Sequence, residues 1–315
     1  MIIKDRTHAD GSKHPTHLSG WHRQHVDPRD RNFMLRSSPL LQLAPSSDLR
    51  SILSPIEDQG QLGSCTAHGV AACIEANEHR RWKLQQLGVA ALPTVTTGAV
   101  SALPDGSIAY QTVVHPPATP QPTPAPTPAP APIGTRLSRL YQYYNSRLIE
   151  GTTGTDSGAS VRDAVAAAAK YGCLDEALYP YDIAKFTQIP TTGQYDAASK
   201  HKVTSYHALA DGDLAAMKTA LLAGYPVVFG FQVYSYFMSQ DMATHGVARL
   251  PQAGEQLEGG HCTALVGHDD SKAAFLVRNS WSANWGLSGY FWMPYAYVSN
   301  ARLASDFWLV QSQVF

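Results

Sequence analysis

Residues 59–65, with the sequence Gln-Gly-Gln-Leu-Gly-Ser-Cys, bring together groups suited to nucleophilic attack on a carbonyl. Cys65 opens a stretch, 66–83, in which apolar residues such as Val70 and Ile74 alternate with charged ones at helical spacing, which predicts an amphipathic helix. A cysteine at a helix N-terminus lies at the positive end of the macrodipole, which favours the thiolate over the thiol. The flanking glycines allow a substrate to approach the backbone closely. This pattern indicates a nucleophilic cysteine.

A thiolate nucleophile needs a base, and His261 is the best placed of the thirteen histidines. It follows two glycines and precedes the apolar run 262–266, so we expect it at the start of a buried strand. Asn279 ends a second apolar run, 274–277, and an adjacent strand would bring its carboxamide to the His261 ring. Trp281 would then shield that hydrogen bond from water.

The developing oxyanion needs donors, and the side-chain amide of Gln59 and the backbone N–H of Cys65 are the natural ones. A histidine at a strand end is by itself more often structural. The conjunction of Gln59, Cys65, His261 and Asn279 in this order reverses that expectation.

The composition excludes several classes. The chain has 315 residues and a formal net charge of −1, which indicates no bulk attraction to nucleic acid or to an anionic membrane. It lacks an apolar run long enough to span a bilayer, and its first residues lack a hydrophobic signal segment. We therefore expect a cytoplasmic protein, or one exported without a cleavable signal peptide. The four cysteines form no metal-binding spacing, Cys73 and Cys173 are interpreted as buried apolar residues, and neither a metal nor another cofactor is expected.

Two segments differ in composition from the rest. Residues 1–42 hold five histidines and seven Lys/Arg against four Asp, and are expected to be polar and irregular. His14 and His17 have a spacing that fits a metal, but an exposed polar tail is the better interpretation. Residues 116–132 contain nine prolines, which favours polyproline II and predicts an insertion over about 88–134.

Periodicity and turn signals predict the remaining elements. Helices are expected at 66–83, 137–149, 161–171 and 214–223, and strands at 227–233, 262–267, 274–278, 290–293 and 307–310. Helices come first and strands later, so the prediction is an α+β protein with segregated helical and sheet portions.

These residues resemble the papain family of cysteine peptidases. Residues 285–290, Trp-Gly-Leu-Ser-Gly-Tyr, resemble the family motif after the catalytic asparagine, and residues 170–181 resemble its helix, turn and Tyr-Pro-Tyr segment. Residues 48–50 resemble the start of the mature enzyme. The match covers about 43–85 and 135–315. The form of residues 58–66 resembles the bacterial branch that includes xylellain.

The resemblance implies a papain-like two-lobed fold over 43–315, with a helical lobe at about 51–183, a β-rich lobe at about 184–315 and the active-site cleft between them. It implies a cysteine endopeptidase that acts on polypeptides through an acyl-enzyme on Cys65, with Trp281 and Trp285 in support. Substrate contacts are expected from small residues that leave room for a bulky apolar side chain: Gly63, Ser64, Gly158, Ala159, Ser160, Gly230, Gly259 and Gly260.

The chain also departs from the family pattern. Thr66 replaces the tryptophan that usually follows the cysteine, and Leu62 replaces a cysteine whose disulfide partner falls near Asp156, so that bridge is expected to be absent. The long helical propeptide is missing. Residues 1–42 are therefore expected to act as a short inhibitory segment across the cleft, with Trp21 among its apolar anchors, although a tail without contact to the cleft is the alternative.

Two other functions compete with peptide hydrolysis. A papain-like acyltransferase or amidase would use the same residues and differ only in the acceptor admitted. A catalytically silent binding protein would instead use the proline-rich tract to dock a partner. Stoichiometric labelling of Cys65 by a thiol-directed inhibitor would favour an enzyme.

Overall fold

The computed structural model describes residues 3–17, 20–24, 27, 30, 44–86, 96–102, 108–113 and 136–314. Its helices are α1 (Cys65–Gln86), α2 (Arg139–Glu150), α3 (Val161–Tyr171), α4 (Thr192–Ala198), α5 (Leu214–Leu222), α6 (Gln240–His245) and α7 (Tyr295–Val298). Short 3-10 turns are η1 (Arg50–Ile52), η2 (Glu176–Leu178), η3 (Ile183–Lys185) and η4 (Ser235–Met238). The strands are β1 (Ile3–Thr7), β2 (Lys13–His17), β3 (Ser46–Asp48), β4 (Thr96–Ala102), β5 (Ile108–Val113), β6 (His201–Leu209), β7 (Val227–Tyr234), β8 (Leu257–Asp269), β9 (Ala274–Arg278), β10 (Tyr290–Pro294) and β11 (Ala304–Val314).

The largest sheet has seven strands, in the order β10-β9-β8-β7-β11-β6 with β3 paired to β8. Its pairings are antiparallel, and the register sets His261 on β8 opposite Phe231 on β7. β9 lies on the other side of β8 and ends at Arg278, one residue before Asn279. The sheet thus brings the ends of two predicted strands together, as the sequence indicated.

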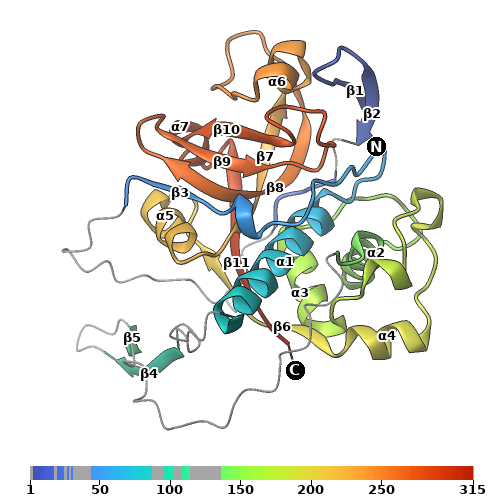
Figure 1. Ribbon diagram of the computed structural model, residues 1–315, viewed down its shortest axis with the longest axis vertical. Helices are drawn as coiled ribbons and strands as arrows, with labels where there is room; N and C mark the ends of the chain where they lie inside the picture. The colour runs from blue at the N-terminus through green and yellow to red at the C-terminus, as the bar shows by residue number, and fades with distance from the viewer. Residues whose placement is uncertain are drawn as a thin grey trace.

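Helix α1 lies between the sheet and helices α2 and α3 (Figure 1). Because both of its sides are covered, every residue from 65 to 78 is buried. The prediction of an amphipathic helix is therefore wrong for its first turns, where Glu75 is buried among apolar residues. An unpaired buried charge is costly, and Glu75 forms an ion pair with buried Arg139 at the start of α2.

Polar side chains cap the first turns of two other predicted helices. Ser160 caps α3 by accepting a hydrogen bond from the Asp163 N–H, and Asp213 caps α5 in the same way from Ala216. α3 ends at Gly172, which has φ 84°, and a Cβ added there would lie 2.0 Å from the Ala198 carbonyl oxygen. Only glycine fits this turn. Helices and an antiparallel sheet confirm the predicted α+β class.

The N-terminal residues differ from the prediction of an irregular, exposed tail. β1 and β2 form an antiparallel hairpin, and Arg6 and Thr16 within it are buried. An isolated two-stranded hairpin is only marginally stable in water, so contacts with the rest of the chain must hold it. These include an ion pair between Lys4 and Glu258 and a hydrogen bond from Thr7 Oγ1 to the Met238 carbonyl. Figure 1 shows the hairpin beside α6.

The predicted insertion contributes one further hairpin. β4 and β5 pair with each other and with no strand of the seven-stranded sheet. The proline-rich tract at 116–132 lies outside the described residues. Among the residues that are described, no helix is long and apolar enough to cross a membrane.

Candidate active site

Cys65 is the first residue of α1 and its side chain is fully buried. Part of its cover is the N-terminal segment, which we define as residues 1–42. A Cβ added to Gly20 would lie 2.8 Å from Cys65 Sγ and 2.9 Å from the Gly63 carbonyl oxygen. The backbone at Gly20 therefore passes directly over the predicted nucleophile, at a distance that only glycine permits.

His261 and Asn279 meet as the sequence predicts. His261 Nε2 and Asn279 Oδ1 are 2.8 Å apart. Since a carboxamide oxygen only accepts, Nε2 is the protonated nitrogen and Nδ1 carries the lone pair. Trp281 stacks on the imidazole with ring centroids 4.7 Å apart, and Trp285 packs edge-on against Trp281 at 5.1 Å. Both indoles are fully buried, so they exclude water from the pair.

The cysteine and the histidine belong to different parts of the fold but converge at β8. The backbone N–H of Cys262, the residue after His261, acts on the Cys65 thiol by lowering its pKa. His261 Nδ1 has no hydrogen-bond partner among the described residues. Cys262 itself packs against α1, since a Cβ added to Gly69 would lie 3.3 Å from its sulfur. This free cysteine is a packing residue, like Cys73 and Cys173.

Gln59 is buried and tied to the loop that follows Asn279. Its Oε1 accepts a hydrogen bond from Ser280 Oγ at 2.7 Å, and its backbone N–H donates to the Ser280 carbonyl at 2.9 Å. Its Nε2 donates to the Leu62 carbonyl at 3.1 Å, which uses one of its two protons. The carboxamide is thus held in one orientation, with one N–H left for a further acceptor.

Burial opposes ionisation of both reactive groups in this conformation. Burial raises the pKa of the Cys65 thiol to about 12, although hydrogen bonds from backbone N–H groups act to lower it. Burial lowers the pKa of His261 to about 3, although the Asn279 hydrogen bond acts in the opposite direction. The helix N-terminus was expected to favour the thiolate, but with the site covered the loss of water is the larger effect.

The predicted substrate-binding residues fall into two groups. Gly230, Gly260 and Ala159 surround Trp21, which is 5% exposed. A Cβ added to Gly230 or Gly260 would lie 2.0 Å or 2.6 Å from the indole ring, and the Ala159 N–H donates to the Gly20 carbonyl at 3.0 Å. We call the space between these residues the Trp21 site.

The second group serves the fold. Ser160 caps α3, Ser64 Oγ lies 2.6 Å from Tyr181 OH, and Gly158 donates its N–H to Tyr143 OH. Gly63 contributes the carbonyl beneath Gly20, and Gly259 continues β8.

Sequence reasoning missed Asp306, which forms the floor of the Trp21 site. Its Oδ2 accepts from Trp21 Nε1 at 3.0 Å and from the Gln24 N–H at 3.1 Å. Asp306 has φ 59° and lies in a β-bulge of β11, where the register to β7 shifts. A bulge re-aims a side chain, and aspartate tolerates this left-handed conformation. The available signal was a carboxylate directly before the apolar run 307–310.

Asp156 lies near the position where the resemblance implied the partner of a disulfide bridge. Gly63 donates its backbone N–H to Asp156 Oδ1 at 3.0 Å, and Tyr143 OH donates to the same oxygen at 2.5 Å. The loop before Cys65 is therefore joined to the loop before α3 by hydrogen bonds. All four cysteines are free.

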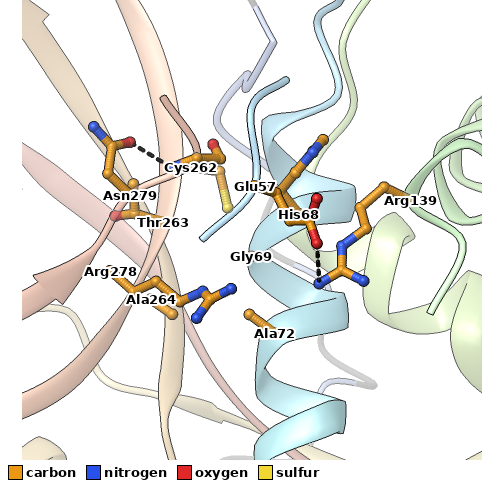
Figure 2. A pocket seen from close by; sticks show the side chains of 11 residues that line it. Glu57, His68, Gly69, Ala72, Arg139, Cys262, Thr263, Ala264, Arg278 and Asn279 are labelled. Atoms are coloured by element: carbon orange, nitrogen blue, oxygen red, sulfur yellow. Dashed lines mark hydrogen bonds and ion pairs between the residues drawn. The ribbon is translucent and has the colours of Figure 1, made fainter. Parts of the chain in front are cut away.

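A small cavity lies between α1 and strands β8 and β9, and Cys262 and Asn279 are among the residues that line it (Figure 2). Its volume is about 10 Å³, room for about one water molecule. The polar atoms Thr263 Oγ1 and Asn279 Nδ2 have no partner among the described residues. The cavity is too small for a peptide. No group of three or more His, Cys, Asp or Glu in the described part of the chain could hold a metal ion.

Known proteins resemble this chain in sequence and in structure. A model described as papain family cysteine protease matches residues 145–309, which include His261 and Asn279 but not Cys65. An uncharacterized peptidase C1-like protein of Acanthamoeba polyphaga mimivirus is 42% identical over 181 residues, 55% of this chain and 58% of that protein. A cathepsin B-like protein of Giardia intestinalis is 36% identical over 84 residues, 25% of this chain and 26% of that protein. The chain thus spans about half and a quarter of these relatives' lengths.

Among solved structures, xylellain, a cysteine protease from Xylella fastidiosa, superposes with a TM-score of 0.71. The two are 29% identical, and the alignment covers 99% of each chain.

Proposed function

Because the chain belongs to the papain family of cysteine proteases, we propose that it is an endopeptidase that hydrolyses peptide bonds with Cys65, His261 and Asn279. The observation that carries this proposal is the His261 ring. The 2.8 Å contact with Asn279 Oδ1 engages Nε2 and leaves Nδ1 as the nitrogen that accepts a proton from Cys65.

The reaction follows from these atoms. His261 Nδ1 takes the thiol proton as Cys65 Sγ attacks the scissile carbonyl carbon. The tetrahedral intermediate collapses, the C–N bond breaks, and His261 returns the proton to the leaving amine. Water then attacks the thioester with His261 as base, releasing the acid and restoring the thiol. Asn279 holds the imidazole in the required tautomer throughout.

The developing negative charge on the carbonyl oxygen needs fixed donors. The backbone N–H of Cys65, at the start of α1, is one of them. The second N–H of Gln59 Nε2 is the other, because Ser280 and Leu62 already fix the carboxamide. Donors held in this way need no reorganisation during the reaction.

Substitution of the nucleophile tests this function. Cys65→Ala should abolish cleavage of a fluorogenic peptide, because no other group replaces the sulfur. Cys73→Ala is the matched control, since Cys73 is equally buried on the same helix. It should leave kcat near that of the unmodified chain when rates are normalised to the folded fraction. Cleavage by Cys65→Ala at the control rate would refute the proposal.

We further propose that the N-terminal segment keeps the enzyme inactive. Gly20 over Cys65 and Trp21 in its site occupy the space that a substrate backbone and side chain need. The segment also binds on both sides of this point. Arg6 donates to both oxygens of Asp58 at 2.7 Å, and Arg162 pairs with Asp27 and Asp30 of the segment at 2.7 and 2.6 Å.

Covering the site acts on the chemistry as well as on access. With water excluded, the pKa of Cys65 is raised and the pKa of His261 is lowered, so the pair stays neutral. Release of the segment would rehydrate both groups and permit the thiolate–imidazolium pair.

A chain that begins at residue 44 tests this inhibition. Once circular dichroism shows that it is folded, it should cleave a small fluorogenic peptide faster than the full chain at equal Cys65 titre. A synthetic peptide of residues 18–40 added in trans should slow it again, weakly, because tethering no longer raises the effective concentration. Equal activity of the two chains would exclude an inhibitory role.

A further inference from the structure

We propose that Tyr181 is a positioning residue for the oxyanion hole, because its hydroxyl bonds to both chain segments that carry the proposed donors. This inference rests on the proposed function, in which Gln59 Nε2 and the Cys65 N–H bind the developing oxyanion. Tyr181 acts through these two segments and needs no contact with the substrate. Its role is to fix the spacing between the two donors.

The Tyr181 hydroxyl lies between the two segments. It donates to the backbone carbonyl of Gln59 at 2.9 Å, and it is 2.6 Å from Ser64 Oγ. A carbonyl oxygen only accepts, so the phenol hydrogen points to Gln59, and the Ser64 hydroxyl donates to the phenol oxygen. Ser64 directly precedes Cys65. One hydroxyl therefore joins Gln59 to the residue before the nucleophile through two directed hydrogen bonds.

The other hydrogen bonds of Gln59 do not provide this link. Ser280 holds its side chain and its backbone N–H from the loop after β9. The Leu62 N–H reaches the Gln59 carbonyl from the same turn at 3.3 Å. The bond from Tyr181, at 2.9 Å, is the shorter of the two at this carbonyl. Tyr181 thus sets where the carbonyl points and, with it, the plane of the peptide that carries Gln59.

Tyr181 is itself held in place by its backbone and its ring. Its N–H donates to Glu176 Oε1 at 2.6 Å, and its ring packs edge-on against the His68 ring with centroids 5.1 Å apart. His68 Nδ1 lies 3.0 Å from the Ser64 carbonyl oxygen, so this nitrogen carries the hydrogen. Burial, together with nearby Arg139, lowers the pKa of His68 to about 3, so the imidazole is neutral at pH 7.

The cluster of Tyr181, Ser64 and His68 is therefore uncharged near neutral pH. Burial raises the pKa of Tyr181, which keeps its hydroxyl protonated. Ser64 is fully buried and His68 is 5% exposed, so water does not readily replace a lost partner. Without the Tyr181 hydroxyl, the Ser64 hydroxyl and the Gln59 carbonyl would shift to find new partners. Oxyanion donors act because they are fixed before the reaction, so such a shift lowers the rate of the chemical step.

Tyr181→Phe tests this role, because it removes the hydroxyl and keeps the ring against His68. The assay uses the full chain carrying Trp21→Ala, in which Cys65 is expected to be more accessible. We expect kcat for a fluorogenic peptide, per titrated Cys65, to fall about tenfold, while KM stays within about twofold.

Tyr179→Phe is the matched control. Tyr179 is a buried tyrosine two residues away, and its hydroxyl donates to the Gln188 carbonyl at 2.5 Å, away from both segments. Its kcat should stay within about twofold of the parent chain. An equal fall in Tyr179→Phe and Tyr181→Phe would show a general loss of packing and would overturn the positioning role.

Alkylation of Cys65 separates the oxyanion hole from the nucleophile. Iodoacetamide is attacked at a saturated carbon, so no oxyanion forms. The alkylation rate in Tyr181→Phe should therefore stay within about twofold of the parent chain, although peptide cleavage slows about tenfold. A similar fall in both rates would show that the hydroxyl acts on the thiol, and would contradict the proposal.

A double-mutant cycle with Gln59→Ala gives a readout that a structural role would not move. With this donor removed, Tyr181→Phe should lower kcat by only about threefold or less, because part of what it positions is already gone. A tenfold fall in both backgrounds would mean that the two residues act independently, against the proposal.

Ser64→Ala gives a measurement that does not depend on the folding of Tyr181→Phe. It removes the donor to the phenol oxygen and keeps the bond from Tyr181 to Gln59, so kcat should fall less, about threefold, with an unchanged alkylation rate. An unchanged kcat in either Ser64→Ala or Tyr181→Phe would overturn the positioning role and leave the protease function intact. A parent chain with titratable Cys65 that cleaves no peptide would refute the proposed function, and the role of Tyr181 with it.

Discussion

Trp21→Ala gives the sharpest test of the proposal that the N-terminal segment covers Cys65. Trp21 is the largest side chain among the described residues of that segment. The indole is 5% exposed and its Nε1 donates to Asp306 at 3.0 Å. Truncating a buried tryptophan to alanine costs about 3–5 kcal/mol. The exposed ion pairs of Lys4 and Arg23 contribute about 1 kcal/mol or less each. The substitution therefore removes a major part of the docking free energy.

A loss of this size raises the open population by about 10²- to 4 × 10³-fold, since 1.4 kcal/mol is a factor of ten. The assay is alkylation of Cys65 by iodoacetamide at pH 7, followed by mass spectrometry of the Cys65 peptide. Cys73 and Cys173 on the same chain serve as internal references, because burial raises the pKa of both thiols. We expect Cys65 alone to react about a hundredfold faster than in the unmodified chain.

The matched control is Trp82→Ala, which removes a tryptophan on α1 that is 36% exposed. It should leave the Cys65 rate unchanged. An alkylation rate in Trp21→Ala within twofold of the control would refute the reasoning. Accelerated alkylation of all four cysteines would show unfolding instead of segment release, and would equally refute it.

The remaining predictions concern catalysis, loop stability, pH and the insertion. Gln59→Ala should lower kcat by about 10²-fold with little change in KM, because it removes one oxyanion donor. Steady-state kinetics on the chain that begins at residue 44 measure this, and an unchanged kcat would exclude the role of Gln59 as a donor. Asp156→Ala should destabilise the fold by about 1–3 kcal/mol, since the Gly63 N–H is left unpaired, and an unchanged denaturation midpoint would count against it. Because the folded-state pKa of Asp306 is raised to about 6, its contribution to stability is present below its unfolded pKa and is lost as pH rises through about 6. Asp306→Asn should therefore reduce the loss of stability between pH 4 and pH 7 by up to about 3 kcal/mol, and identical pH profiles would refute this. Replacing residues 90–132 with a short Gly/Ser linker should leave folding and small-peptide turnover nearly unchanged, because loop closure depends weakly on length, and loss of either would show that the insertion packs on the core.

The sequence alone determined the elements and the chemical groups. α3 and β9 have the predicted bounds, since capping residues and buried apolar runs are local signals. His261 and Asn279 were predictable because each ends or begins such a run. The hydrogen bond between them follows from the pairing of β8 with β9.

Tertiary structure decided what surrounds those groups. The hairpin β1–β2 has little apolar periodicity and forms on the rest of the chain, so local reasoning interpreted it as an exposed tail. Burial of Glu75 depends on a helix being covered from both sides, and its pairing with Arg139 depends on how α2 packs. The position of Asp306 depends on a bulge in β11 and on Trp21, which is 285 residues away along the chain. Such contacts are set by long-range packing, which composition, spacing and periodicity do not encode.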